Sequence, residues 1–450
     1  MAESAQVVAS EGFRVYGYRW VVLAVAMAVN LTIQILWIAY ASITSEAAAY
    51  YHVSTLAVGL FSMTFMIAYI PLSLPSAWLI DSKGFRFAMG LGVILMGVFG
   101  VMRGLAGANY TLALLATIGL AIAQPFLMNA WTTVPAKWFP MDERATGVGL
   151  ITLASLVGTA VGLVLTPALR SGLSISSVQL VYGLAAAVAA VAFLALAREH
   201  PPTPPCPPGL EERALVLDGL KHALKVRPFL LYLAVVFVGM GIFNGVTTWV
   251  EQIIKPRGFT SGDAGVLGAL LLLGGVLGAV GMSALSDRQH KRVRYLVIGL
   301  AVAAPALLVV TYGRSLPVLF AGAFVLGFFL ISVSPIGMQF SAEVTYPTPE
   351  GTSNGLIQLF GQSAVVWVYL MELLRTGNGS FAPSLVLSAA LLVVGAIVLS
   401  RLHDPTIMRE GKEAAPLAAS APLVKVQDQT VGAAATSAAD PAVEQQVKPV

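Results

Sequence analysis

The chain has 450 residues, of which 57% are hydrophobic and only 11% are charged, and its mean hydropathy is +0.82. A soluble globular domain has about 25% charged residues. The composition therefore excludes a soluble protein and indicates a chain embedded in a membrane.

Along the chain, apolar stretches alternate with short charged or Pro- and Gly-rich breaks. Each stretch has about 20 residues, which as a helix crosses a hydrocarbon layer of about 30 Å, whereas barrel strands have about 10 residues and alternate in polarity. The sequence therefore predicts an all-α membrane protein with twelve transmembrane helices. Their expected spans are 19–43, 53–80, 85–106, 110–135, 144–168, 176–197, 229–254, 263–285, 293–312, 316–342, 352–374 and 381–401.

These spans divide the chain into two bundles of six helices. We expect a cytosolic N-terminal segment (1–18), a first bundle (19–197), a cytosolic linker (198–228), a second bundle (229–401) and a disordered cytosolic tail (402–450). The linker opens with a Pro-rich run that cannot be a membrane helix, and Leu210–Val226 is amphipathic and predicts a short surface helix. The pattern is compatible with a hinge and equally with a plain linker.

The distribution of Lys and Arg predicts the orientation. With both termini in the cytosol, 20 of the 26 basic residues fall on the cytosolic side and 6 on the outer side. This bias accounts for the net charge of +4 without a nucleic-acid or acidic partner. No cleavable signal peptide is visible. We expect a multi-pass protein of the plasma membrane, in contact with lipid and acting as a monomer.

Two sequence features recur at one offset. Asp81 and Asp287, each between two apolar runs, are 206 residues apart, and so are Gly149 and Gly355, each after an aromatic–Pro pair and a charged turn. Two pairs at the same offset indicate two equivalent halves. In a membrane chain, duplicated halves are typical of a transporter with its site between them.

Nothing in the sequence predicts an enzyme, a metal site or a cofactor. Cys206 is the single cysteine, and the five His residues fall in loops, the linker or the tail. There is no Ser/His/Asp constellation, no ligand spacing for a metal and no phosphate-binding loop.

The two repeated loops are candidates for conformational control. Each has an Asp at a helix end followed by basic residues, represented by Asp81 with Arg86 and by Asp287 with Arg288. Such an Asp can accept hydrogen bonds from a neighbouring helix N-terminus and can pair with Arg. The loops resemble the cytosolic motif of the major facilitator superfamily, Gly-x-x-x-Asp-Arg-x-Gly-Arg-Arg. The chain departs from it at Ala77 and Ser283, where the family has Gly, and at Ser82.

Three charged residues border the second repeated feature. Glu343 and Glu350 flank the junction between the tenth and eleventh helices, and Arg144 lies at the matching junction of the first half. They could form part of an inner gate, and helix capping explains them equally well.

Polar side chains inside apolar spans are candidates for a binding site, because leaving them in hydrocarbon is costly. They recur at helical spacing and are amides and aromatics with few charges, which fits a neutral or cationic organic solute. Interhelical hydrogen bonding that only stabilises packing is the alternative. The candidates are Gln34, Trp37, Gln124, Trp131, Asn244, Gln358 and Gln362.

Two acids near the outer ends of the first and seventh helices could couple transport to a proton or attract a cation. These are Glu46 and Glu251. An exposed carboxylate at the membrane interface is the simpler expectation, and no acid lies in the middle of a predicted span.

Three segments narrow the resemblance within the superfamily. They are Gln34-Ile-Leu-Trp-Ile-Ala-Tyr-Ala-Ser-Ile43, Tyr69-Ile-Pro-Leu-Ser-Leu-Pro-Ser-Ala-Trp-Leu-Ile-Asp81 and Ala342-Glu-Val-Thr-Tyr-Pro-Thr-Pro-Glu-Gly-Thr-Ser-Asn-Gly-Leu356. All three resemble the feline leukaemia virus subgroup C receptor-related transporters of solute carrier family 49, over residues 19–400.

That resemblance implies the major facilitator fold and transport of choline and ethanolamine, with haem and, for one relative, pyridoxine also proposed. The family's choline site corresponds to Trp37, Gln124, Asn244 and Gln362. Asn244 departs from the family, which has Tyr there. Since aromatic faces hold a quaternary ammonium, this departure weakens a choline site, and Trp131 or Trp249 could replace the lost wall.

We therefore expect an alternating-access transporter of a small organic cation or amine such as choline or ethanolamine, working by facilitated diffusion. A proton-coupled transporter of another metabolite (haem, pyridoxine, a carboxylate or a drug) is the first alternative. A non-transporting membrane receptor or sensor is the second.

Overall fold

The structure is a computed structural model that describes residues 15–140, 143–203, 217–346, 348 and 350–404. Residues up to Pro405 belong to one unit of the chain. The expected tail lies outside the described residues from 405 onward, as do residues 1–14 and the middle of the linker, 204–216, which includes the start of the expected surface helix.

In the first half, the regular elements of the described residues are all helices. In chain order they are α2 (Arg19–Ile38), a 3-10 turn (Ala41–Ile43), α3 (Thr44–Tyr51), α4 (Thr55–Lys83), α5 (Phe85–Leu105), α6 (Tyr110–Met128), α7 (Thr133–Trp138), α8 (Arg144–Arg170) and α9 (Ile175–Leu196).

The second half follows the same plan. Its helices are α10 (Leu217–Ala223), α11 (Arg227–Thr248), α12 (Val250–Ile254), α13 (Ser261–Gln289), α14 (Arg292–Tyr312), α15 (Leu316–Val344), α16 (Glu350–Ser363), α17 (Val365–Leu373) and α18 (Ala382–Ser400), with a 3-10 turn at Lys255–Arg257. The short helix α10 lies within the amphipathic segment expected in the linker.

In the part of the chain that the structure describes, twelve helices are long and apolar enough to cross a membrane, which confirms the predicted number. The structure adds interruptions inside four of them. The first predicted helix bends after Ile38, the fourth after Met128, the seventh after Thr248 and the eleventh after Ser363.

Small residues let the helices approach closely within each half. A Cβ atom at Gly183 of α9 would lie 2.3 Å from the carbonyl oxygen of Gly100 on α5, and one at Gly158 of α8 would lie 2.2 Å from the Leu31 carbonyl oxygen on α2. Since any side chain would separate these backbones, α5–α9 and α2–α8 packing depends on glycine.

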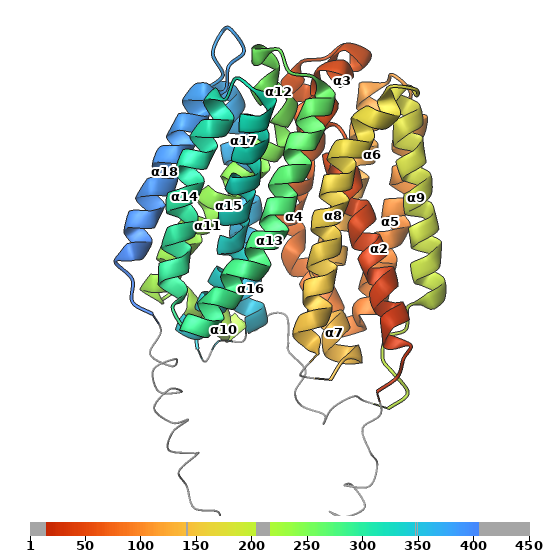
Figure 1. The fold of residues 1–450 in the computed structure, drawn as a ribbon. Coiled ribbons are helices and arrows are strands. Elements are labelled where there is room, and N and C mark those ends of the chain that lie inside the picture. Colours follow the sequence, from red (N-terminus) through yellow and green to blue (C-terminus); the bar gives the residue numbers. More distant parts are fainter. Residues whose placement is uncertain (1–14, 141–142, 204–216, 347, 349, 405–450) are drawn as a thin grey trace, which may run out of the picture. The chain divides into compact units, whose positions relative to one another are not determined.

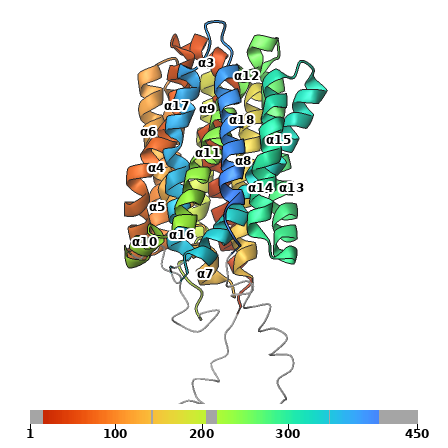
Figure 2. The same cartoon turned by 90° about the vertical axis from the view of Figure 1, so that its left-hand side faces the viewer.

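Long helices of the two halves pack against each other at two places. Helix α8 packs against α13, and α4 packs against α16 and α17. The short helices lie at opposite ends of the bundles, with α3 and α12 at one end and α7 and α10 at the other (Figures 1 and 2). We call these the α3–α12 end and the α7–α10 end.

Candidate functional site

The structure brings two of the predicted amide side chains together. The Nε2 atom of Gln124 on α6 lies 3.4 Å from Oε1 of Gln34 on α2. Gln124 is 4% exposed, and its Oε1 atom has no hydrogen-bond partner among the described residues. A buried acceptor without a partner costs about 1–3 kcal/mol, so this oxygen is a strong candidate for contact with a solute.

The two predicted tryptophans are held by their indole N–H groups. Trp37 donates to the Ser62 carbonyl oxygen at 3.2 Å, and the Ser62 hydroxyl donates to the Trp37 carbonyl oxygen at the same distance. Trp131 donates to Oδ1 of Asn30 at 2.6 Å. With their N–H groups engaged, only the ring faces remain for binding, and ring faces are what attracts a cation.

The second half contributes a matching set of amides. Asn244 on α11 is 4% exposed, and its Nδ2 atom has no partner among the described residues. Gln362 is buried in the last turn of α16, and Gln358 is half-buried one turn earlier. No hydrogen bond between described residues joins this set to Gln34 or Gln124.

The candidates are close to the helix interruptions. Trp37 precedes the end of α2 by one residue, and Gln362 precedes the end of α16 by one residue. Gln124 and Asn244 each precede the end of their helix by four residues. Irregular backbone at membrane depth is tolerated where it is buried in protein or borders a cavity, and transporter sites are built at such breaks.

At the α3–α12 end, hydrogen bonds link the two halves directly. The Glu251 carboxylate on α12 accepts from the Ser45 backbone N–H at 2.8 Å, and Gln252 donates to the Ser45 hydroxyl at 2.6 Å. Glu251 is 4% exposed. The expectation that it would be an exposed interfacial acid is therefore wrong, because the chain breaks after Thr248 and α12 turns toward the first half.

A second set of contacts extends this link. Arg375 donates to Oε1 of Gln252 at 3.3 Å, to Oε1 of Glu372 at 3.1 Å and to the Thr55 hydroxyl at 3.1 Å. Thr55 belongs to α4 of the first half and also donates to Glu372 at 3.2 Å. We call Ser45, Thr55, Glu251, Gln252, Glu372 and Arg375 the inter-half network.

Glu46 lies beside this network and also bridges the halves. Its carboxylate is 3.1 Å from Nε of Arg170 in the first half and accepts from the Ser261 hydroxyl of the second half at 3.4 Å. Its side chain is 41% exposed. At the α3–α12 end, polar side chains of the two halves thus bind each other directly.

At the α7–α10 end, the charged residues of the second half pair within that half. Arg292 at the start of α14 is buried and forms ion pairs with Asp287 and with Glu343 at 3.4 Å. The sequence indicated Asp287 and Arg288 as candidates for conformational control and left Glu343 open between an inner gate and helix capping. In the structure both acids pair with Arg292, whose guanidinium fork can serve two carboxylates at once.

Two acids cap the N-termini of the helices that follow the two repeated loops. Glu199 accepts from the backbone N–H groups of Phe85 and Arg86 at 3.1 and 2.7 Å, and Asp404 accepts from that of Val293 at 2.9 Å. Each acid follows the last helix of its half. These two caps come from residues far along the chain, which loop spacing alone does not reveal, and the capping predicted for Asp81 and Asp287 stays a prediction.

The remaining predicted gate residues are only partly described. Arg144 donates from Nε to the Phe139 carbonyl oxygen at 3.4 Å, and both it and Asp81 have further interactions. Arg288 is exposed. Glu350 begins α16, and its side chain lies outside the described part of the chain.

One buried charge, Arg103, was not among the predicted site residues, because the sequence indicates only a basic residue near the outer end of the predicted span 85–106. It lies in the last turn of α5, is 1% exposed, donates from Nη1 to the Leu36 carbonyl oxygen at 2.9 Å and lies 5.4 Å from the Tyr40 ring centroid. An Arg close to a loop gives no sequence signal of burial. Within the described residues, no three His, Cys, Asp or Glu side chains gather as a metal site requires.

Comparison with known proteins identifies relatives across most of the chain. Residues 22–369 match the family model of the Major Facilitator Superfamily. Solute carrier family 49 member A3 of Danio rerio is 30% identical over 392 residues, covering 83% of this chain and 82% of the relative. The choline/ethanolamine transporter flvcr2a of Danio rerio is 27% identical over 372 residues, covering 77% and 79%. The choline/ethanolamine transporter FLVCR1 of Mus musculus is 27% identical over 394 residues, covering 79% and 69%.

Solved structures share the fold. A bacterial homologue of the human lysosomal transporter Spinster, in an inward-facing and unoccupied conformation, superposes with a TM-score of 0.65 at 18% identity, covering 86% of this chain and 96% of the other. The human organic anion transporter MFSD10 superposes with a TM-score of 0.62 at 16% identity, covering 85% and 99%. At these identities the likeness concerns the arrangement of helices.

Proposed function

Because the chain belongs to the major facilitator superfamily and is related to solute carrier family 49, we propose that it transports a small organic cation or amine of the choline and ethanolamine class. As a member of this superfamily with twelve apolar helices, it is a multi-pass integral membrane protein that transports a small-molecule solute. The class of solute, the absence of proton coupling and the residues of the site are parts of the proposal.

The observation that carries the proposal is the pair of unpartnered amide atoms in opposite halves. Gln124 offers a carbonyl oxygen and Asn244 offers an N–H₂ group, and each is buried and has no partner among the described residues. A solute with a hydroxyl group, such as choline or ethanolamine, can donate to the first and accept from the second. The faces of Trp37 and Trp131 provide the attraction for its ammonium group.

Transport then follows from a shift between two arrangements of the halves. In the described arrangement, the inter-half network holds the α3–α12 end together. Opening that end breaks the contacts of Ser45 and Thr55 with the second half, and a solute at the central amides gains access from that side. A solute drives this shift only by binding one arrangement better than the other.

We assign the α7–α10 end to the cytosol, and we propose that both chain termini lie on the cytosolic side of the membrane. The support is the excess of Lys and Arg on that side, 20 against 6, which sets membrane topology. The α3–α12 end then faces the outside of the plasma membrane.

Uptake of radiolabelled choline into proteoliposomes tests the proposal. We expect saturable uptake down a choline gradient, inhibited by ethanolamine and unchanged by an imposed pH gradient. Empty liposomes and liposomes with a Trp37→Ala variant are the controls. Absence of choline and ethanolamine flux under all conditions would refute the proposed solute class.

One structural observation favours a second candidate, a proton-coupled transporter of another metabolite. The buried carboxylate of Glu251 accepts the Ser45 N–H bond that joins the halves, so adding a proton to it would remove a charge-assisted contact. This candidate predicts that a pH gradient alone accelerates flux. It also predicts that Glu251→Gln abolishes the acceleration.

A further inference from the structure

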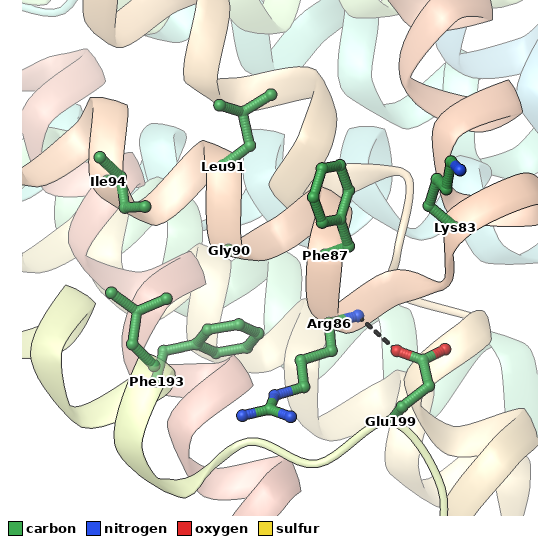
Figure 3. Close-up of a pocket in the computed structure, with 9 residues that line it drawn as sticks. Lys83, Arg86, Phe87, Gly90, Leu91, Ile94, Phe193 and Glu199 are labelled. Carbon is green, nitrogen blue, oxygen red and sulfur yellow. Dashed lines mark hydrogen bonds between the residues drawn. The ribbon is translucent and has the colours of Figure 1, made fainter.

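A groove opens at the α7–α10 end between the start of α5 and the end of α9 (Figure 3). Its volume is about 470 Å³, and it is bordered by Lys83, Arg86 and Glu199 at one side and by apolar side chains at the other. It lies outside the proposed transport site, because its residues come from helix ends and not from the helix interruptions.

Two cations at the groove are available to a ligand. Lys83 and Arg86 are exposed, and within the described part of the chain the Lys83 ammonium and the Arg86 guanidinium have no hydrogen-bond or ion-pair partner. Of Arg86, only the backbone N–H is engaged, with Glu199 (Figure 3). Two free cations at the mouth of one groove make it attractive to an anionic group.

The acid at the groove does not oppose such a group. The Glu199 carboxylate is neutralised by Lys137, whose Nζ atom lies 2.5 Å from Oε1, and it accepts two backbone N–H bonds from the start of α5. Its charge is therefore already satisfied by a cation and a helix N-terminus. After this neutralisation, the net charge at the groove is positive and comes from Lys83 and Arg86.

The wall of the groove is apolar and faces outward. Phe87, Leu91 and Ile94 are 58%, 39% and 47% exposed, and their spacing places them on one face of α5. Because α5 is long and apolar enough to cross a membrane, we expect this face to contact lipid chains. The groove thus joins an apolar face for an acyl chain to a cationic mouth at the membrane surface.

The second half shows why Arg86 is free. Arg292, which is 206 residues after Arg86, is buried and paired with Glu343. The residue 206 positions before Glu343 is Lys137. The position equivalent to the acid that pairs with Arg292 thus carries a cation in the first half, and this cation, Lys137, forms an ion pair with Glu199. With a cation at this position of the first half, the Arg86 guanidinium has no partner among the residues that the structure describes.

We propose that this groove binds an anionic glycerophospholipid of the cytosolic leaflet, with its phosphate at the Arg86 guanidinium, Lys83 adding positive charge to the same rim, and an acyl chain along Phe87, Leu91 and Ile94. The choice of leaflet rests on the proposed orientation. An Arg guanidinium matches the geometry of a phosphate, and a Lys adds a point charge. Basic residues at the inner surface attract anionic lipids.

The groove is tested by thermal unfolding of the full chain in detergent, with phosphatidylserine or phosphatidylcholine added. This measurement does not depend on transport or on the orientation of the protein in the membrane. We expect phosphatidylserine to raise the unfolding temperature saturably and well above the effect of phosphatidylcholine, because a ligand that binds the folded state stabilises it. Soluble glycerophosphoserine, which has the headgroup without acyl chains, should give no rise.

The double variant Lys83→Gln/Arg86→Gln should weaken the phosphatidylserine effect about tenfold in lipid concentration. Arg288→Gln/Lys291→Gln is the matched control, with the same change of charge on exposed residues of the second-half loop, and should keep the effect. If the double variant does not fold, the single variant Arg86→Gln replaces it. It should also weaken the phosphatidylserine effect, but by less than the double variant. Equal loss in both double variants, equal effects of the two lipids, or a rise with glycerophosphoserine would overturn the proposal.

Discussion

The two ends of the helical bundles use polar residues in different ways. At the α3–α12 end, hydrogen bonds of Glu251, Gln252 and Arg375 join the second half to Ser45 and Thr55 of the first. At the α7–α10 end, Arg292 pairs with acids of its own half and Lys137 with Glu199 of its own half. Bonds inside a half hold a bundle together in every conformation, whereas bonds between halves must break for transport.

This difference gives each end a distinct test. Variants at the α7–α10 end should change the stability of the protein, and variants at the α3–α12 end should change the balance between its conformations. The amides between the two ends are tested by solute affinity. If variants at both ends acted alike on stability and on conformation, the distinction between them would be lost.

The largest effect on stability is expected at Arg292. Replacing it in Arg292→Met leaves the Glu343 side chain, 10% exposed, without its cation. Removing one partner of a buried ion pair costs about 3 kcal/mol, and thermal unfolding in detergent should show a clear drop in the midpoint. Arg288→Met, at an exposed position in the same loop, should stay within about 0.5 kcal/mol. Equal stability of the two variants would mean that the Arg292 pairs do not hold the second half together.

The next effect is conformational and concerns Glu251. Glu251→Ala removes a charged acceptor of a bond between halves, which is worth about 1.5–3 kcal/mol, so the population open at the α3–α12 end should rise about tenfold or more. Electron–electron distance measurements between spin labels on Ala108→Cys and Gly377→Cys, in a Cys206→Ser background, report that population. These labels sit on exposed loops of the two halves.

Asn378→Ala is the matched control for Glu251. Asn378 is exposed at the same end, and its described side-chain bond is local, with Thr376. The label distances in this variant should match those of the parent. A Glu251→Ala protein with unchanged distances would show that the inter-half network does not hold this end closed.

A smaller effect is expected on solute affinity at Gln124. Gln124→Leu removes the unpartnered buried oxygen, and losing one hydrogen bond to the solute should raise the KM for choline uptake about tenfold. Gln179→Leu is the matched control, because Gln179 on α9 is also buried with both amide atoms unpartnered and lies outside the predicted set. Comparable losses in both variants would indicate that buried amides act through packing.

The smallest effect is expected from adding an aromatic wall. Asn244→Tyr introduces the residue type that the related choline site has, and a cation over an aromatic face gains about 0.5–1 kcal/mol at partly exposed sites. Choline affinity, measured by binding or by uptake, should increase a few-fold. Asn244→Leu is the control, because it also removes the amide but adds no aromatic ring. A drop in affinity for Asn244→Tyr relative to Asn244→Leu would contradict the placement of Asn244 beside the ammonium group.

Much of the fold could be predicted from the sequence because it depends on local composition. Twelve apolar runs and the 206-residue offset are sufficient for two equivalent bundles, and the structure confirms the number of spans. The interruptions in the first, fourth, seventh and eleventh helices could not be predicted in this way. The segment around Tyr40 has no Pro or Gly at the break, so tertiary contacts, and not a local breaker, determine its position.

The candidate site was only partly accessible to the same reasoning. Helical spacing singled out Gln34 and Gln124, which the structure brings within 3.4 Å. The link between Ser45 and Gln252 joins residues 207 apart, and the capping of α5 joins Arg86 to Glu199, 113 apart. The sequence shows that these residues are polar. Which of several acids pairs with a given Arg or backbone N–H group depends on how the helices pack.

Distances at both ends of one protein, measured with and without choline, test alternating access most directly. A second label pair at Ser82→Cys and Gln289→Cys reports the α7–α10 end, and the Ala108→Cys and Gly377→Cys pair reports the α3–α12 end. We predict that choline changes the populations at the two ends in opposite directions, one pair lengthening as the other shortens. If both pairs move together, or neither responds to choline, ethanolamine or any other solute that the protein carries, the halves do not alternate around a central site as proposed here.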